Sequence, residues 1–178
     1  MNTTLYTVTI PVFIKSLESL SGIIDKAVLH AQSPAEDAPT IDMQELMQAR
    51  LAPDQFPFAK QVQLASDTAK GFAARLNGEE PVSMPDTETT MEELKKRIDA
   101  TIALLKDVKP ETVEGKEDVQ VTIKWFPGKF ITGFGFATEY VLPNFFFHVT
   151  TAYAILRHNG VQLGKADYLG AISLQDLA

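Results

Sequence analysis

Apolar residues recur along the chain at alternating steps of four and three, which is the spacing of one face of a helix packed in a bundle. The first segment has its apolar positions at Tyr6, Ile10, Phe13, Leu17, Leu20, Ile24, Ala27 and Ala31. Pro11 lies within this run, so we expect it either to kink the helix or to mark the start of the helix. The pattern predicts a first long helix.

Two further segments repeat this pattern between clear boundaries. The second contains Phe58, Val62, Ala65, Ala69, Phe72 and Leu76, and the third contains Met91, Leu94, Ile98, Thr101, Leu105 and Val108. Gly78 follows the second segment as a helix stop. The third begins at Thr89 or Thr90, where Glu92 and Glu93 are placed for a capping box. Each segment predicts one helix.

A fourth helix is predicted over residues 138–159, and Asn159 and Gly160 end it. Its apolar stripe is Leu142, Phe145, Val149, Ala152 and Leu156. Pro143 either lies in the first turn or kinks a helix that begins near Thr138. We expect the tail, residues 161–178, to be irregular with a short helical end at best.

The segments between the helices contain prolines and indicate connectors. Residues 32–53 contain three prolines, and residues 77–89 contain two. Asp42 is placed to cap one short helix inside the first connector. Both connectors are long enough to allow different orders of neighbouring helices in the bundle.

Residues 119–132 change to strand periodicity. Val119, Val121, Ile123 and Trp125 alternate with polar residues, Pro127-Gly128 supplies a turn, and residues 129–132 return as a second strand. A lone hairpin is marginally stable in water, so we expect it to lie against the bundle. Its aromatic side chains, Trp125, Phe126 and Phe130, would then be buried there or at a partner interface.

These elements predict a mainly α protein, a four-helix bundle with a small β-hairpin between the third and fourth helices. The 178 residues, of which 45% are hydrophobic and 22% charged, are typical of a globular chain. We expect one domain over residues 1–178.

Charge and cysteine content exclude several functions. A net charge of -7 argues against a surface that binds nucleic acid, and the absence of cysteine excludes disulfides, thiol nucleophiles and cysteine-ligated metals. The N-terminus lacks the features of a signal peptide, and the longest apolar candidate, residues 130–149, contains Glu139, Pro143, Asn144 and His148. We therefore expect a soluble, cytoplasmic protein without membrane contact.

Candidate polar residues gather on the fourth helix. His148 shares an edge of the apolar face with Asn144 and Thr151, and such a polar line inside a bundle needs partners or water. A hydrogen-bonded core histidine is one interpretation and a functional histidine the other. His30 and His158 lie at helix ends, where a cation favours the helix dipole. The basic run at residues 95–97 is predicted to face solvent.

Motifs for catalysis or metal binding are weak. Nucleotide-binding and serine-hydrolase motifs are missing, and neither a His-x-x-x-His nor a Glu-x-x-His pair occurs. A metal site in a bundle needs three or four inward ligands. His148 could supply one, with Asp67 or Gln63 as partners from the second helix, whereas Asn144 is a poor ligand for zinc or iron.

The C-terminal segment is distinctive. It contains LPNFFFH at residues 142–148, TTAYAILRHNG at 150–160 and LGKAD at 163–167. This segment resembles an uncharacterised bacterial family of domains of unknown function (DUF1993 type) within the DinB/YfiT-like superfamily. The opening of the first helix and the Pro-Gly hairpin are also similar, so the resemblance spans the chain. It implies a DinB-like four-helix bundle and a homodimer, with no established activity.

The resemblance also allows the metal ligands of DinB-like proteins to be compared with residues of this sequence. Many DinB-like proteins bind a divalent metal through three histidines, one from the second helix and two, four apart, from the last helix, and some are thiol-dependent transferases. If Leu156-Arg157 matches the Leu-Arg that follows the last ligand, His148 corresponds to the final histidine. Asn144 then stands at the other ligand position of that helix, and the second helix has no histidine.

Three functions follow. The first is a metal-free protein without a cofactor, binding a small ligand or a partner near the fourth helix; whether the chain is an enzyme is left open. The second is a divalent-metal enzyme (zinc or nickel, thiol transferase or hydrolase type) that uses His148 and Asp67. The third is a purely structural role. The ligand site of the first hypothesis would comprise Asn144, His148, Trp125, Tyr153 and Arg157.

Overall fold

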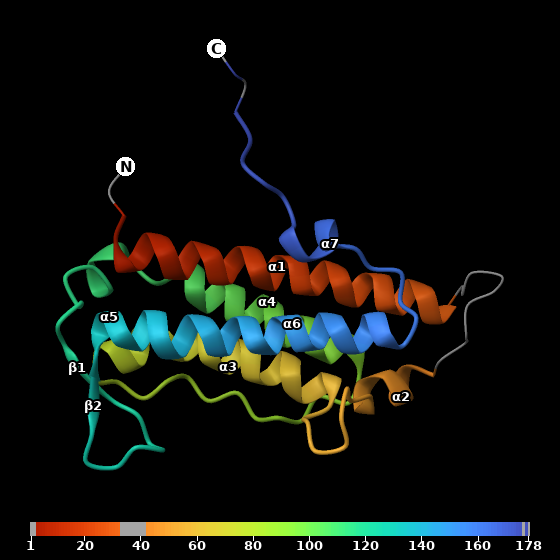
Figure 1. The fold of residues 1–178 in the computed structure, drawn as a ribbon, viewed down its shortest axis with the longest axis horizontal. Coiled ribbons are helices and arrows are strands. Elements are labelled where there is room, and N and C mark those ends of the chain that lie inside the picture. Colours follow the sequence, from red (N-terminus) through yellow and green to blue (C-terminus); the bar gives the residue numbers. More distant parts are fainter. Residues whose placement is uncertain (1–2, 33–41, 176, 178) are drawn as a thin grey trace.

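The computed structural model describes residues 3–32, 42–175 and 177. Four long helices lie side by side along one axis (Figure 1). They are α1 (Leu5–Gln32), α3 (Phe58–Leu76), α4 (Met91–Lys106) and α6 (Leu142–His158). The shorter elements are α2 (Met43–Gln48), η1 (Pro110–Thr112), β1 (Gln120–Thr122), β2 (Phe130–Thr132), α5 (Gly133–Gly135), η2 (Phe136–Val141) and α7 (Lys165–Leu169). The predicted fold class, a helical bundle with one small hairpin, is confirmed.

The bundle closes around an aromatic core. Helix α3 packs against α4 and α6, and α1 packs against the same two helices. Phe13 of α1 contacts Phe72 of α3 and Phe145 of α6, with ring centroids 5.9 Å and 4.8 Å apart in edge-to-face geometry. All three rings are fully buried. The predicted stripes thus meet in one core.

The helix boundaries follow local signals closely. Helix α3 spans the predicted segment, and α4 begins with the expected capping box: Glu93 N donates to Thr90 Oγ1 at 3.2 Å, and Thr90 N donates to Glu93 Oε2 at 3.1 Å. Asp42 caps α2 by accepting from Gln44 N at 2.7 Å. Pro11 lies on the exposed side within α1, which begins earlier, at Leu5.

The last long helix begins earlier than the sequence predicted. Helical structure starts at Gly133, passes through the π-helical turn η2 and continues into α6, with Pro143 in the first turn of α6. Gly133 is required by a close approach, because a Cβ there would lie 1.9 Å from the carbonyl oxygen of Lys116. A side chain at residue 133 would therefore collide with this neighbouring backbone segment.

The hairpin is confirmed, but the burial of its aromatic residues is not. Val121 pairs with Ile131 in the antiparallel ladder, and Val121 is buried. The connecting segment 123–129 projects from the side of the bundle near one end (Figure 1). Trp125, Phe126 and Phe130 are 71%, 53% and 57% exposed. The expectation that they pack against the bundle was wrong; a partner interface stays a prediction.

The basic run of α4 is divided between two environments. Lys95 forms an ion pair with Asp25 of α1, and Lys96 pairs with Glu92 on the surface. Arg97, however, is buried at 5% exposure, because its position borders the apolar stripe and faces the connector 77–89. The prediction of a solvated face was wrong for Arg97.

Helix α1 is the one described helix that is long and apolar enough to cross a bilayer by length and composition, although a core helix of a soluble bundle has the same properties. Only 39% of its most apolar window is buried. The apolar candidate expected at residues 130–149 is instead divided between β2, α5, η2 and α6.

After α6 the chain turns back over the bundle. Helix α7 packs on α1, where Asp167 forms a salt bridge of 2.6 Å with Lys26 and accepts from Gly164 N at 2.8 Å. These contacts lower the pKa of Asp167. The predicted short helix therefore lies at residues 165–169 rather than at the chain end, and residues 171–175 form no helix or strand.

Candidate functional site

The contact surface between α3 and α6 contains the polar residues that the sequence singled out. His148 is 7% exposed, and its Nδ1 lies 2.7 Å from Gln61 Oε1 of α3. The amide of Gln61 is itself fixed, because its Nε2 donates to the carbonyl oxygen of Phe56 at 2.9 Å. This leaves Oε1 as an acceptor toward the imidazole, so Nδ1 of His148 is the protonated nitrogen.

The imidazole of His148 is neutral at physiological pH. Burial, with a smaller contribution from the positive charge of Lys60, lowers the pKa of His148 to about 4. The Nε2 lone pair receives no hydrogen bond from any described residue. His148 is thus an oriented hydrogen-bond acceptor, and both the structural and the functional interpretation of the sequence are compatible with this geometry.

Asn144 lies one turn earlier on the same side of α6. Its Nδ2 donates to Thr68 Oγ1 of α3 at 2.8 Å, and Thr68 in turn donates to the carbonyl oxygen of Leu64 at 2.7 Å. The structure brings Asn144 and His148 to one helix contact. Each forms one hydrogen bond with a residue of α3, which stabilises the packing of the two helices.

The other predicted ligand residues lie elsewhere. Trp125 is in the hairpin loop, with Lys124 Nζ 5.7 Å from its ring centroid. Tyr153 packs edge-on against Tyr168 of α7, with ring centroids 5.8 Å apart. Arg157 is exposed at the end of α6 and donates to the carbonyl oxygen of Val161 at 3.3 Å. The predicted set therefore does not form one pocket.

The donor set around His148 does not fit a divalent metal. Asp67 pairs with Arg97 at 2.7 Å and with Lys70 at 2.9 Å on the side of α3 that faces α4. Gln63 donates to Glu88 at 2.9 Å in the same direction. Across residues 3–32, 42–175 and 177, no group of three His, Cys, Asp or Glu side chains could hold a metal ion.

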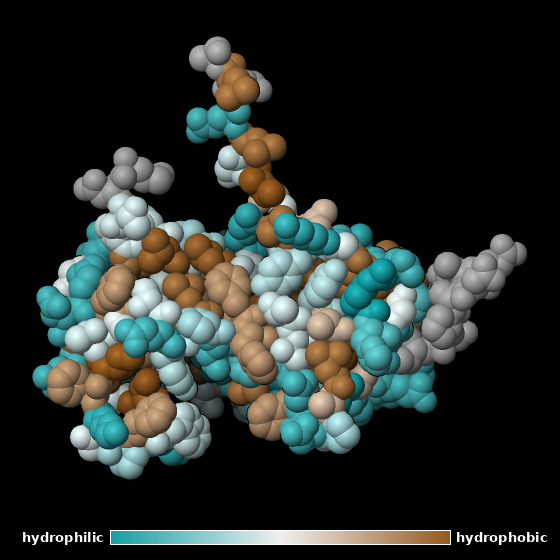
Figure 2. Space-filling view, in the orientation of Figure 1, coloured by the Kyte–Doolittle hydropathy of each residue, from teal (hydrophilic) through white to brown (hydrophobic). Residues whose placement is uncertain are grey.

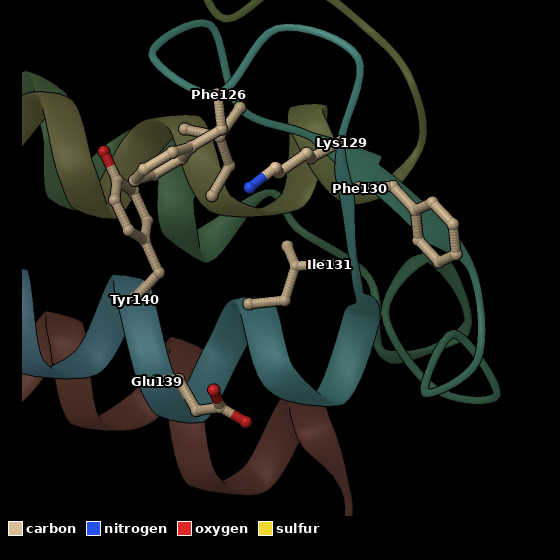
Figure 3. A pocket seen from close by; sticks show the side chains of 7 residues that line it. Phe126, Lys129, Phe130, Ile131, Glu139 and Tyr140 are labelled. Atoms are coloured by element: carbon tan, nitrogen blue, oxygen red, sulfur yellow. The ribbon is translucent and has the colours of Figure 1, made fainter.

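A pocket that the sequence did not predict lies between the hairpin and the start of the last helix. This hairpin pocket has a volume of about 310 Å³. It is lined by Ile123, Phe126, Lys129, Phe130, Ile131, Glu139 and Tyr140 (Figure 3). Glu139 and Tyr140 come from η2, and π-helical turns occur frequently at functional sites.

Comparison with known proteins identifies the family of this chain. A family model described as a domain of unknown function, DUF1993, matches residues 5–169. The chain belongs to the DUF1993 family. The crystal structure of a DinB family member from Shewanella denitrificans is 41% identical, covers 97% of this chain and 96% of that chain, and has a TM-score of 0.90. Among curated proteins, nothing matches the chain.

The hairpin pocket of this DUF1993 protein is mainly apolar, and its lining contains one cationic residue, Lys129, and one acidic residue, Glu139. The Lys129 ammonium is directed between Phe126 and Ile131 (Figure 3), and no carboxylate of the described residues forms an ion pair with it. Residues 119–132 contain two lysines and no acidic residue, in a chain whose net charge is -7. The sequence signal for this pocket was the cluster of aromatic residues and lysines around Pro127-Gly128. The aromatic residues were expected to be buried against the bundle or at a partner interface.

Proposed function

We propose that this protein binds a small amphipathic carboxylate in the hairpin pocket. The observation that supports this function is a mainly apolar pocket of about 310 Å³ that receives one ammonium group, from Lys129. Ligand pockets combine apolar walls with a few polar groups that fix the orientation of the ligand. Their volumes start at about 300 Å³. Because no ion pair joins Lys129 to a carboxylate among the described residues, its ammonium favours an anionic group on the ligand.

The walls of the pocket select the rest of the ligand. Phe126 and Ile131 come from the hairpin, and the Tyr140 ring comes from the last helix, so an apolar chain or ring would be held between two elements. The Tyr140 ring stacks on Phe136 at a centroid distance of 5.9 Å, and Phe136 is buried in the core. One wall is therefore rigid, while the hairpin supplies the other.

The experiment compares decanoate with 1-decanol by isothermal titration calorimetry. The two probes share an apolar chain and differ in charge, so decanoate should bind more tightly to the wild-type protein. Lys129→Gln should weaken decanoate binding about tenfold and leave 1-decanol binding unchanged, since one ionic contact is worth about 1.4 kcal/mol in a partly buried site. Phe126→Ala should weaken the binding of both probes.

Lys165→Gln is the matched control, because Lys165 is an exposed lysine of α7 outside the hairpin pocket. It should leave both affinities unchanged. Equal decanoate affinity in the wild-type protein and Lys129→Gln, or no saturable binding of either probe, would contradict the proposed function.

A further inference from the structure

A second cavity lies at the end of the bundle that carries the hairpin, between the end of α3, the start of the connector 77–89 and β1. Figure 1 shows these three segments at that end, and Figure 2 shows hydrophilic beside hydrophobic side chains on its surface. The cavity has a volume of about 370 Å³, and its charged and hydrogen-bonding side chains are Arg75, Glu79, Glu80, Gln120, Thr122 and Lys124. None of them lines the hairpin pocket, and we name this second site the polar cavity.

The backbone at the end of α3 fixes the first wall of the polar cavity. Gly78 has a φ of 72°, its N donates to the carbonyl oxygen of Arg75 at 3.1 Å, and Glu79 N donates to the carbonyl oxygen of Ala74 at 2.9 Å. These two hydrogen bonds form a Schellman motif, which ends the helix and sets the direction of the chain that follows. A Cβ at residue 71 would lie 2.0 Å from Arg75 Nη1, so Gly71 leaves room for the guanidinium against α3. One helix end therefore positions both a cation and a carboxylate.

The hairpin supplies the second wall. Gln120 and Thr122 of β1, and Lys124 after it, lie at alternate positions, and all three line the polar cavity. Side chains at alternate positions of a strand share one face. Val121, on the other face, is 2% exposed, and β1 packs against α3. This buried residue anchors β1, while the polar face is directed to the cavity.

The charged groups of the polar cavity do not neutralise one another. Two are cationic, Arg75 and Lys124, and two are anionic, Glu79 and Glu80. No ion pair in the described part of the chain includes any of the four. Lys124 Nζ instead lies 5.7 Å from the ring centroid of the exposed Trp125. Two charges of each sign thus share one cavity and have no ionic partner among the described residues.

We propose that the polar cavity binds a small zwitterion, a molecule with one carboxylate and one ammonium group. Arg75 and Lys124 bind the carboxylate through charge-assisted hydrogen bonds, and Glu79 and Glu80 bind the ammonium in the same way. A ligand with a single charge is attracted by one pair of these residues and repelled by the other pair. The volume of about 370 Å³ lies within the range of about 300–1,000 Å³ that ligand pockets have.

The neutral side chains of the polar cavity agree with this ligand class. Gln120 and Thr122 offer an amide and a hydroxyl group, and Pro81 is the one apolar side chain of the lining. The hairpin pocket, in contrast, is lined mainly by aromatic and aliphatic residues. The two sites share no lining residue, so the polar cavity binds its ligand whether or not the hairpin pocket binds a carboxylate.

Three probes of matched chain length test the ligand class. γ-Aminobutyrate has both charges, butyrate has only the negative charge, and butylamine has only the positive charge. In an NMR titration of the wild-type protein at neutral pH, γ-aminobutyrate should shift the backbone amide signals of Gln120 and Thr122 in a saturable way. Its dissociation constant should be at least about tenfold lower than that of either other probe, because two charged contacts form instead of one.

Variants of each sign test the two halves of the cavity. Arg75→Gln should weaken γ-aminobutyrate binding at least about fivefold without weakening butylamine binding. Glu79→Gln/Glu80→Gln should weaken γ-aminobutyrate binding at least as much without weakening butyrate binding. Lys15→Gln and Glu45→Gln are charge-matched controls at exposed residues outside the cavity, and they should leave all three affinities unchanged.

Two further measurements separate this site from changes in folding and from the hairpin pocket. Arg75, Glu79 and Glu80 are exposed, so circular dichroism of their variants should match that of the wild-type protein. Lys129→Gln, in the hairpin pocket, should bind γ-aminobutyrate like the wild type. Equal dissociation constants for the three probes, no saturable shift at Gln120 and Thr122, or unchanged γ-aminobutyrate affinity in the folded cavity variants would overturn the proposal.

Discussion

The guanidinium of Arg97 on α4 lies 2.7 Å from the carboxylate of Asp67 on α3, and the same side chain contacts Glu88 at 2.9 Å and Asp86 at 3.0 Å. Only 2% of the Arg97 side chain is exposed. It also donates to the carbonyl oxygen of Pro85 at 3.2 Å. One buried cation therefore joins two helices to the connector 77–89.

Removing this cation should destabilise the protein strongly. Arg97→Leu leaves Asp67, Asp86 and Glu88 close together without their shared partner, and breaking a buried ionic cluster on one side costs about 3–5 kcal/mol. The midpoint of urea unfolding should fall accordingly. Lys96→Gln, one residue earlier, removes an exposed pair with Glu92 and should leave the midpoint unchanged. Equal midpoints for the two variants would contradict this account.

Stability should depend on the protonation of His148. The pKa of His148 is about 4 in the folded protein and near 6.5 in an unfolded chain. Between these values the unfolded state binds the proton more tightly, so the free energy of unfolding falls as pH decreases from 6.5 to 4. The loss from this one group is up to about 3 kcal/mol.

His148→Gln separates this contribution from other acidic effects. Glutamine does not titrate in this range, so the part of the pH dependence that belongs to His148 should disappear in the variant. Urea unfolding between pH 4 and pH 8, with an NMR titration of the His148 ring, measures both quantities. An NMR pKa near 6.5 for the folded protein would show that the imidazole is not desolvated.

The aromatic core can be tested at one ring. Phe145 is fully buried and contacts Phe13 at 4.8 Å, so Phe145→Ala should cost about 3–5 kcal/mol of unfolding free energy. Phe134→Ala changes a side chain that is 57% exposed and should have little effect. Thermal unfolding followed by circular dichroism compares the two. If Phe145→Ala had the same melting temperature as the wild-type protein, the assignment of Phe145 to the buried face of α6 would be wrong.

The apolar stripes predicted the bundle because each stripe is a local pattern in the sequence. A single core then buries all of these stripes. The boundaries of α3 and the capping box of Thr90 and Glu93 follow from neighbouring residues alone. Arg97 was misassigned because its environment depends on how the preceding connector lies against α4, where it supplies Asp86 and Glu88. Local charge balance with Glu92 and Glu93 favoured a solvated face, although Arg97 lies at the edge of the apolar stripe, three residues after Leu94.

The candidate site was only partly predictable for the same reason. Asn144 and His148 share one side of α6, so their juxtaposition follows from helical spacing. Gln61, the partner of His148, lies 87 positions away and has no motif. The hairpin pocket depends on how segment 123–129 projects beside Tyr140, which strand periodicity does not describe.

Metal binding gives the sharpest test of how far this protein follows the three-histidine pattern. His148 presents one imidazole nitrogen, Asn144 bonds Thr68, and the carboxylate of Asp67 is held by Arg97. One neutral nitrogen without further ligands binds zinc weakly, because structural and catalytic zinc sites use three or four protein ligands. Calorimetric titration with Zn²⁺ or Ni²⁺ at pH 7.5 should therefore give no stoichiometric binding, and His148→Ala should titrate like the wild-type protein. Stoichiometric binding that His148→Ala abolishes would instead make the metal-dependent enzyme the better interpretation.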